Sequence, residues 1–372
     1  MPLDVPQTKI VKSIFVECGK GTETPPFRVV CEQLSDDDTT LDRHEVKVLV
    51  RACGLTSQNF SKVQDLLKRI QGGRSHSLIS NSLTSSQQFE GPTRLSVGQD
   101  VAGIVLAIGS EVSSLNVGDE VAGMIPLDST QSGCSESVIF QEFDLVKKPK
   151  KVSFVDAAGC IGDAVKAYTA LCFLARMKAG NSVLVLNGAS SFGSLCVQLA
   201  DLWGAKVLST ATSRDEVLYL KSLGSNKVQV LEMGESDPLS LRAACMHETG
   251  GLGVDVLVES DSLSSFHSKH EMISCLAVGG CWVTTRSNLQ IDPPNSRQLY
   301  MRCASLAYLF EQAWLLSSVQ QGRHQHVLRD IMEKLSSDAI RPNIHHTVSF
   351  DEVADAVLGL EEVKVGKVVM MV

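Results

Sequence analysis

Asn187, Ser190 and Gly193 lie three residues apart in a turn that follows an apolar run at Val183–Leu186. Small residues at this spacing, between a strand and a helix, form the loop that holds the pyrophosphate of a dinucleotide against a helix N-terminus. The first position makes the turn, the second lets the backbone approach phosphate, and the third lets the helix pack on the strand. The sequence therefore predicts a dinucleotide-binding βαβ unit with only the third glycine kept.

The two replaced glycines have different consequences for cofactor binding. Asn187 can still make the turn, because asparagine tolerates left-handed backbone angles, and Gly188 adds freedom. Ser190 is the harder replacement, since its Cβ stands where the backbone should approach phosphate. Its hydroxyl could donate a hydrogen bond instead, and Ser191 could cap the helix. Two interpretations stay open: a weakened cofactor site, or a retained packing turn in which Gly193 serves only helix–strand contact.

The tip of the second strand decides which dinucleotide such a unit prefers. Enzymes that use NAD place Asp or Glu there to bind the ribose, and Thr210–Ser213 contains neither. Arg214 could contact a 2′-phosphate, so the sequence favours NADP over NAD. The alternative is that Ser213 and Glu216 form a capping box with Arg214 in the first helical turn. In either case Glu216 would repel a phosphate group.

Around this turn, short apolar runs alternate with segments that suit helices. Strands are expected at Val183–Leu186, Ala205–Thr210, Val228–Leu231, Val254–Glu259 and Cys281–Thr284. Helices are expected between them, at Gly193–Trp203, Arg214–Leu223, Leu239–His247 and Lys269–Leu276. This order is typical of an α/β protein with a doubly wound parallel sheet.

The segment before this sheet has a different pattern. Period-two alternation or bounding glycines predict strands at His44–Ala52, Val101–Gly109 and Asp119–Gly123. A long helix is expected over Asp156–Met177, with Ser153 or Asp156 as its cap. The chain then closes with a helix at Asp351–Leu360 and a strand at Lys367–Met371.

These elements divide the chain into three predicted segments. Residues 1–152 form a mostly-β domain, in which 71–93, rich in Ser, Gly and Gln, are a flexible loop insertion. Residues 153–290 form the dinucleotide-binding domain. Residues 291–372 return to the first domain.

Composition limits the classes of protein that this chain can belong to. It has 372 residues, of which 44% are hydrophobic and 20% charged, which is ordinary for a globular protein. We expect no secretory signal, and no apolar run approaching the roughly 18–20 residues of a membrane span. The eleven cysteines never form a CxxC pair, which indicates reduced thiols and a cytoplasmic protein.

Charge argues against direct nucleic-acid binding. The net charge is −8, and a nucleic-acid surface is basic. The exception is the basic run Lys147–Lys151, which could contact a phosphate, an RNA or a partner. The simpler interpretation is a solvated turn between two strands.

Six short motifs follow one another at the spacing of a known family: Arg51–Leu55, Gly98–Gly103, Val117–Val121, Ala167–Leu171, Thr249–Asp255 and Gly366–Val369. In this order they resemble the zinc-free quinone oxidoreductase branch of the medium-chain dehydrogenase/reductase superfamily, over nearly the whole chain. The resemblance implies a GroES-like mostly-β domain plus a Rossmann domain, with NADPH and a quinone or enone in the cleft between them. It also implies that Gly279 and Lys367 contribute to the cofactor site.

The resemblance is least complete where the reaction would take place. Zinc-dependent relatives have a cysteine and a His–Glu pair where this chain has Thr56 and Gln99-Asp100, so no metal is expected. Quinone reductases usually carry an Asn and an Asp, then often a Tyr, in the segment where this chain has Thr56, Asn59 and Ser61. No catalytic residue is therefore assigned.

A second departure lies on the long helix. The family threonine two residues before Tyr168 is replaced by Lys166. Lys166 could pair with Asp163, which is three residues away on the helix, or it could contact a phosphate or a partner. Tyr168 is expected to pack rather than to act as an acid.

Two functions stay open. The first is a weak NADPH-dependent quinone or enone reductase. The second is a catalytically silent reductase fold, because the segments NGASSFG, TGGLGVD, GGCWVTT and LQIDPPNS resemble a subgroup known as subunits of the FERRY complex. That assembly links early endosomes to mRNA and the translation machinery, so the resemblance implies recruitment to early endosomes by FERRY subunits. The family also implies a homodimer through the Rossmann domain, near Asn288–Tyr308.

Overall fold

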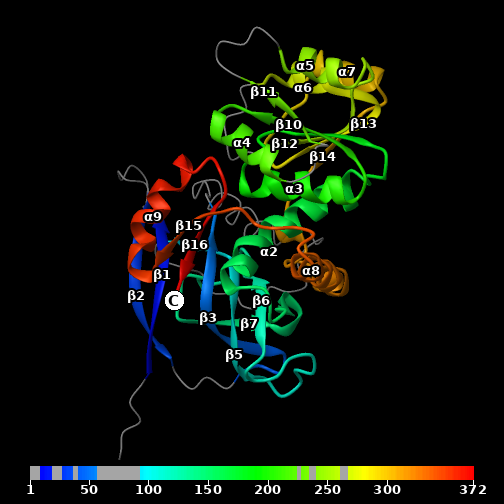
Figure 1. Cartoon of the computed structure of the whole chain (residues 1–372). Coiled ribbons are helices and arrows are strands. Elements are labelled where there is room, and N and C mark those ends of the chain that lie inside the picture. Colours follow the sequence, from blue (N-terminus) through cyan, green and yellow to red (C-terminus); the bar gives the residue numbers. More distant parts are fainter. Residues whose placement is uncertain are drawn as a thin grey trace, which may run out of the picture.

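The structure is a computed structural model that describes residues 9–18, 27–36, 41–56, 93–223, 228–233, 240–259 and 267–372. Two sheets dominate the described chain, one in the upper half of Figure 1 and one in the lower half. The candidate site lies where the two halves meet.

The upper sheet has six parallel strands in the order β11-β10-β9-β12-β13-β14. The strands are β9 Ser182–Val185, β10 Lys206–Ala211, β11 Gln229–Glu232, β12 Val254–Glu259, β13 Leu276–Thr284 and β14 Ser305–Tyr308. The helices that cover it are α3 Ser191–Leu202, α4 Arg214–Ser222, α5 Leu241–Glu248, α6 Lys269–Cys275 and α7 Asn295–Met301. This is the strand order of a dinucleotide-binding fold, whose ligands bind at the carboxyl ends of β9 and β12.

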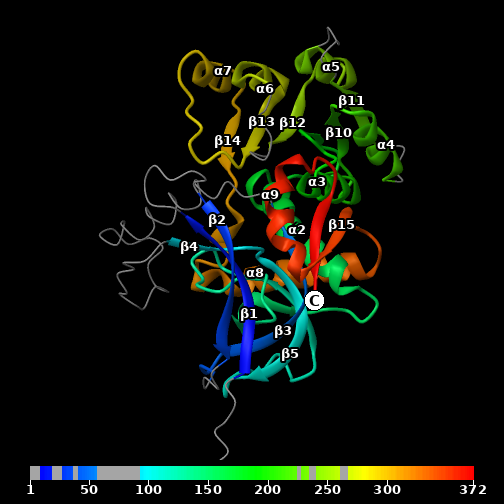
Figure 2. The ribbon, with the colours of Figure 1, turned by 90° about the vertical axis from the view of Figure 1, so that its left-hand side faces the viewer.

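The lower sheet has seven strands in the order β15-β16-β3-β5-β6-β8, with β7 also paired to β3. Its strands are β3 Glu45–Leu55, β5 Asp100–Ile108, β6 Glu120–Met124, β7 Ser137–Gln141, β8 Leu145–Lys147, β15 Ile344–Ser349 and β16 Lys367–Met371. A smaller sheet joins β1 Lys9–Cys18, β2 Phe27–Asp36 and β4 Thr93–Ser96. Because β15 and β16 complete the lower sheet, the chain returns to its first domain after the Rossmann sheet, and the predicted fold class is confirmed (Figure 2).

Two long helices lie between the sheets. Helix α2 is Phe154–Tyr168, is capped by the Ser153 hydroxyl, and continues as a π-helix through Leu174. Helix α8 is Gln321–Ser336 and packs on α2 and β8. A short helix α9 (Val353–Gly359) covers the strands β15 and β16 (Figures 1 and 2).

The run Phe154–Leu174 corrects one expectation from the sequence. By length and composition these 21 residues could cross a membrane, but 72% of their most apolar window is buried inside the protein. The helix is rich in small apolar residues, which allow it to pack closely on β3, β5 and β16. The run is a core helix.

Three further expectations concern the end of the Rossmann domain, the loop insertion and the cysteines. The Rossmann sheet continues beyond residue 290, since β14 is its outermost strand. Residues 71–92, and with them most of the expected loop, lie outside the described part of the chain. Cys31 and the nine cysteines from Cys53 onward are free.

Candidate functional site

The turn after β9 has the backbone that its sequence predicts. Asn187 has a φ of +58°, which is the left-handed conformation that asparagine tolerates. A Cβ on Gly193 would stand 2.3 Å from the Asn187 carbonyl oxygen, and one on Gly188 would stand 2.0 Å from the Ser209 hydroxyl. Both glycines are therefore required for packing, whether or not a cofactor binds.

The hydroxyl of Ser190 is used inside the turn. It donates to the Asn187 carbonyl (2.8 Å) and accepts from the Gly193 amide (3.1 Å). Ser190 is thus the N-cap of α3, and the expectation that Ser191 caps this helix was wrong. The reason is geometric, because an N-cap lies just outside the helix in extended conformation, and Ser190 has φ −63° and ψ 162°.

The two serine side chains of this turn make contacts within the protein. The Ser191 hydroxyl lies close enough to Asp163 to help lower the pKa of that carboxyl group, so it faces a carboxylate of the protein. A helix N-terminus attracts anions, and here the protein places its own carboxylate, Asp163, beside the first residue of α3. A dinucleotide would have to bind without these side chains.

The tip of β10 is occupied by an internal contact as well. The Glu216 carboxylate is 1% exposed and accepts hydrogen bonds from the Thr212 amide (2.6 Å) and hydroxyl (3.2 Å). Ser213 caps α4 by accepting from the Glu216 amide, so one of the two hydrogen bonds of the expected capping box is confirmed. In a usual capping box the Glu216 carboxylate would accept from the amide of the N-cap residue, Ser213, but here it accepts from the amide of Thr212. Arg214 is exposed in the first turn of α4.

Three charged side chains from distant parts of the chain meet below the turn. The Lys367 ammonium contacts Asp100 and lies 3.0 Å from Asp163, and Lys367 is 3% exposed. Gly366 donates its amide to the Ala189 carbonyl (3.3 Å), which places this cluster beside the turn. The charge of Lys367, predicted to contribute to a cofactor site, is thus bound by two carboxylates of the protein.

Burial and charge act in opposite directions in this cluster. Burial would raise the pKa of Asp163, but Lys367, Lys166 and the Ser191 hydroxyl outweigh it and hold that pKa low. Burial would lower the pKa of Lys367, but Asp100 and Asp163 raise it. The lysine therefore stays charged as the counterion of the pair.

Glycines make room for these charges. A Cβ on Gly54 would stand 2.9 Å from the Lys367 side chain, and one on Gly162 would stand 2.1 Å from an Asp100 carboxylate oxygen. Neither residue has a φ in the left-handed region, so space rather than backbone conformation requires them. The sequence carried no local signal for this role.

Lys166 has a different partner from the one expected. Its ammonium lies 3.8 Å from Glu311 and 5.5 Å from the centre of the Phe192 ring, whereas Asp163 is bound by Lys367. The expected close Lys166–Asp163 ion pair is not among the ion pairs of the described residues, and the Lys166 charge acts on Asp163 only from a longer distance. Tyr168 packs against Trp203 at 5.1 Å between ring centres, as expected of a packing residue.

A further polar group lies at the carboxyl end of β12, where a nicotinamide fold places its ligand. Glu259 is buried, accepts from Trp282 (3.2 Å) and Thr284 (3.1 Å), and pairs with Arg286 at 2.7 Å. Glu259 was not predicted as a site residue, although a Glu that ends an apolar strand was a usable signal. Its contacts lie within the protein.

Other predicted residues lie apart from the turn. Gly279 is in the first half of β13, and the amino ends of parallel strands lie on the opposite edge of the sheet from the turn. Thr56 lines a cavity of about 10 Å³, which is room for one water molecule. Among the described residues no group of three or more His, Cys, Asp or Glu is placed to hold a metal ion. Asn59 and Ser61 lie outside the described residues.

Comparisons with known proteins identify the family. The model of the alcohol dehydrogenase GroES-like domain matches residues 42–150. Quinone oxidoreductase-like protein 1 of Mus musculus is 41% identical over 267 residues, which are 69% of this chain and 76% of that protein.

Solved structures share the fold over nearly the full length. An alcohol dehydrogenase superfamily protein from Novosphingobium aromaticivorans has a TM-score of 0.76 at 20% identity, covering 98% of this chain and 100% of its own. CurK enoyl reductase has a TM-score of 0.73 at 24% identity, covering 96% of this chain and 98% of its own. The chain therefore belongs to the medium-chain dehydrogenase/reductase superfamily and, within it, to the family of quinone oxidoreductase-like protein 1.

Proposed function

We propose that this protein uses a reductase fold as a subunit of a protein assembly, with the side chains of its cofactor turn committed to the fold. The assembly implied by the resemblance is the FERRY complex, which would recruit the chain from the cytoplasm to early endosomes. The observation that carries the proposal is the turn at Asn187–Gly193. The Ser190 hydroxyl donates to the Asn187 carbonyl, and the carboxylate of Asp163 lies near Ser191 at the start of α3.

Weak NADPH-dependent reduction of quinones or enones is the second candidate. Its support is at the tip of β10, where Arg214 is exposed and no acid precedes Ser213. The left-handed backbone of the turn, with Asn187 at a φ of +58°, also favours it. Against it, Glu216 is fixed under the same tip, where a 2′-phosphate would bring further negative charge.

The first prediction separates these two functions by ligand-induced stabilisation. Ligand at a hundredfold excess over its Kd stabilises a protein by about 2.7 kcal/mol. We expect no shift of the thermal midpoint with NADPH or NADH at ~1 mM, because the Asp163 carboxylate beside the start of α3 would repel the pyrophosphate. In parallel, tagged protein purified from cytosol should retain FERRY subunits through size-exclusion chromatography.

The control for this experiment restores the family glycine at position 190 and also removes the Ser191 hydroxyl. The variant S190G/S191G removes both hydroxyls and leaves Asp163 paired with Lys367, and it should still fold because Asn187 and Gly193 are retained. A clear NADPH shift in the unaltered protein, with quinone turnover and no retained subunits, would establish the reductase and overturn the assembly role.

The second prediction concerns the homodimer that we propose through the Rossmann domain. Strand β14 is an edge of the sheet, and beside it Tyr300 and Met301 are 83% and 72% exposed. Exposed apolar groups next to an open strand edge mark an interface. We expect the variant Y300E/M301E to elute as a 40.1 kDa monomer where the unaltered chain elutes as a dimer. The control is L218E, at an exposed position of α4, which packs beside β11 at the opposite edge of the sheet. This variant should stay dimeric.

A further inference from the structure

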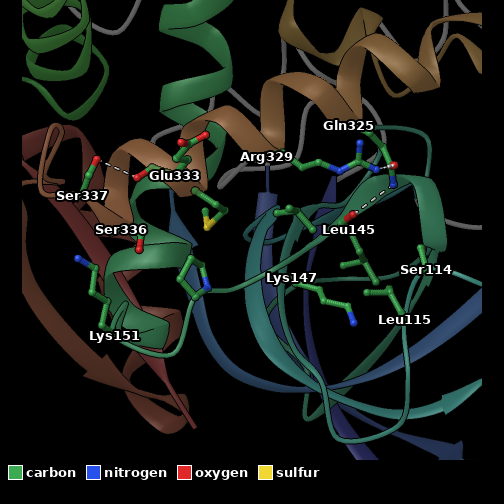
Figure 3. A pocket seen from close by; sticks show the side chains of 13 residues that line it. Ser114, Leu115, Leu145, Lys147, Lys151, Gln325, Arg329, Glu333, Ser336 and Ser337 are labelled. Carbon is green, nitrogen blue, oxygen red and sulfur yellow. Dashed lines mark hydrogen bonds between the residues drawn. The ribbon is translucent and has the colours of Figure 1, made fainter.

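A groove of about 660 Å³ lies between β8 and the second half of α8. Its apolar part includes Leu115, Val146 and Met332, all buried. Figure 3 shows Lys147 and Lys151 reaching it from below and Arg329 from α8 above. No residue of the turn 187–193 lines it, so the groove is separate from the candidate cofactor site.

The basic run Lys147–Lys151 divides into a structural and an exposed part. Lys148 is buried, and its ammonium pairs with Glu120 at 2.7 Å and donates to the Val152 carbonyl at 2.5 Å. Lys147 and Lys151 are exposed and line the groove. The run connects β8 to α2, so the expected solvated turn between two strands was wrong.

The charge of the groove is opposite to that of the whole chain. Its charged lining consists of Lys147, Lys151, Arg329 and one acid, Glu333, in a chain with a net charge of −8. Lys147 pairs with Asp119 at 2.8 Å. Within the described ranges, neither Lys151 nor Arg329 forms an ion pair with an acid of this protein. Among the described residues, the Arg329 guanidinium donates only to the Gln325 amide oxygen.

Strand β8 adds an open edge to this groove. It is the last strand of its sheet and pairs with β6 on one side only. The Lys148 amide donates to the Glu120 carbonyl on β6. Because the N–H and C=O groups of successive strand residues point to opposite sides of the strand, those of Leu145 and Lys147 point away from β6. Gln325 donates to the outward carbonyl of Leu145 (3.5 Å). None of the described residues bonds the outward N–H and C=O of Lys147.

We propose that this groove binds an extended acidic segment of a partner protein, which adds to the outer edge of β8 as a further strand. Main-chain hydrogen bonds would give such a segment affinity. Its apolar side chains would contact the apolar residues of the groove, and its acidic side chains, at the alternate positions, would contact Lys147, Lys151 and Arg329. RNA is disfavoured because no aromatic side chain lines the groove, and single-stranded nucleic acids bind by stacking on aromatic rings. The inference rests on the proposed function only in assigning the segment to an assembly partner.

The test uses the purified full-length chain and a fluorescein-labelled decapeptide in which Glu alternates with Val. We expect K151E/R329E to weaken peptide binding at least tenfold, because both cations face the groove without a counterion in the described structure. The matched control is K178E/R323E, which makes the same charge change at two exposed positions outside the groove. Hydrogen exchange should show peptide-dependent protection at Lys147.

Three results would overturn the groove proposal: equal weakening by both variants, no protection at Lys147, or tighter binding of single-stranded poly(U) than of the peptide. A Lys–Val decapeptide checks that charge rather than strand propensity decides binding. Since the assay contains neither NADPH nor other subunits, its outcome is independent of the experiment on the proposed function.

Discussion

Replacing Lys367 with methionine is expected to lower the free energy of unfolding by about 3–5 kcal/mol, the usual cost of breaking a buried ion pair from one side. The variant would leave the carboxylates of Asp100 and Asp163 together in a site away from water, with no counterion at their shared contact. Urea unfolding at pH 7.5 measures the loss.

The matched control for this prediction lies three residues away. Lys364 is exposed, so Lys364→Met should change the free energy of unfolding by less than about 0.5 kcal/mol. The triple variant K367M/D100N/D163N should recover much of the stability, since it removes the uncompensated charges together with the lysine. A loss below about 1 kcal/mol in Lys367→Met would mean that water reaches the cluster.

His324 should make the protein sensitive to acid, and this is the second large effect. The residue is 1% exposed, and neither ring nitrogen has a hydrogen-bond partner among the described residues. Burial lowers the pKa of His324 from 6.5 to about 4. Between these values the unfolded chain binds a proton that the folded protein does not, so stability falls as pH falls. At one histidine, this difference corresponds to about 3 kcal/mol.

The measurement compares two histidines on one helix. Urea unfolding at pH 7.5 and at pH 4.5 should show a smaller loss of stability on acidification in His324→Leu than in the unaltered protein. His326, two residues further along α8, is exposed, and His326→Leu should leave the pH dependence unchanged. Equal behaviour of the two variants would show that His324 is protonated within the folded protein.

Local patterns predicted the parts of the fold that depend on local forces. The strands β9, β10, β12 and β16 follow from their apolar runs. The caps of α2 and α4 follow from Ser153 and Ser213, because a cap involves residues only three positions apart. Strand β8 was missed, since three residues that end in a basic run carry too little periodicity to be recognised.

The candidate site was harder to predict because its contacts join distant positions. Asp100 and Lys367 are 267 positions apart, and Asp163 and Lys367 are 204 apart. The helix spacing of Asp163 and Lys166 suggested a pair, but the tertiary fold gave each a distant partner. The direction of the Ser190 hydroxyl was equally invisible, because donation to phosphate and donation to Asn187 require the same residue type.

The place of β16 between β15 and β3 sets an order of events during synthesis. The ribosome makes β3 and β5 first, then the whole Rossmann sheet, and only then the strand that pairs with β3. Until that strand emerges, the nascent chain exposes the part of the β3 edge that follows its pairing with β7, and it lacks the lysine that neutralises Asp100 and Asp163. The first domain can therefore reach its native state only after the second has been translated, and its open edge needs protection from aggregation throughout that interval.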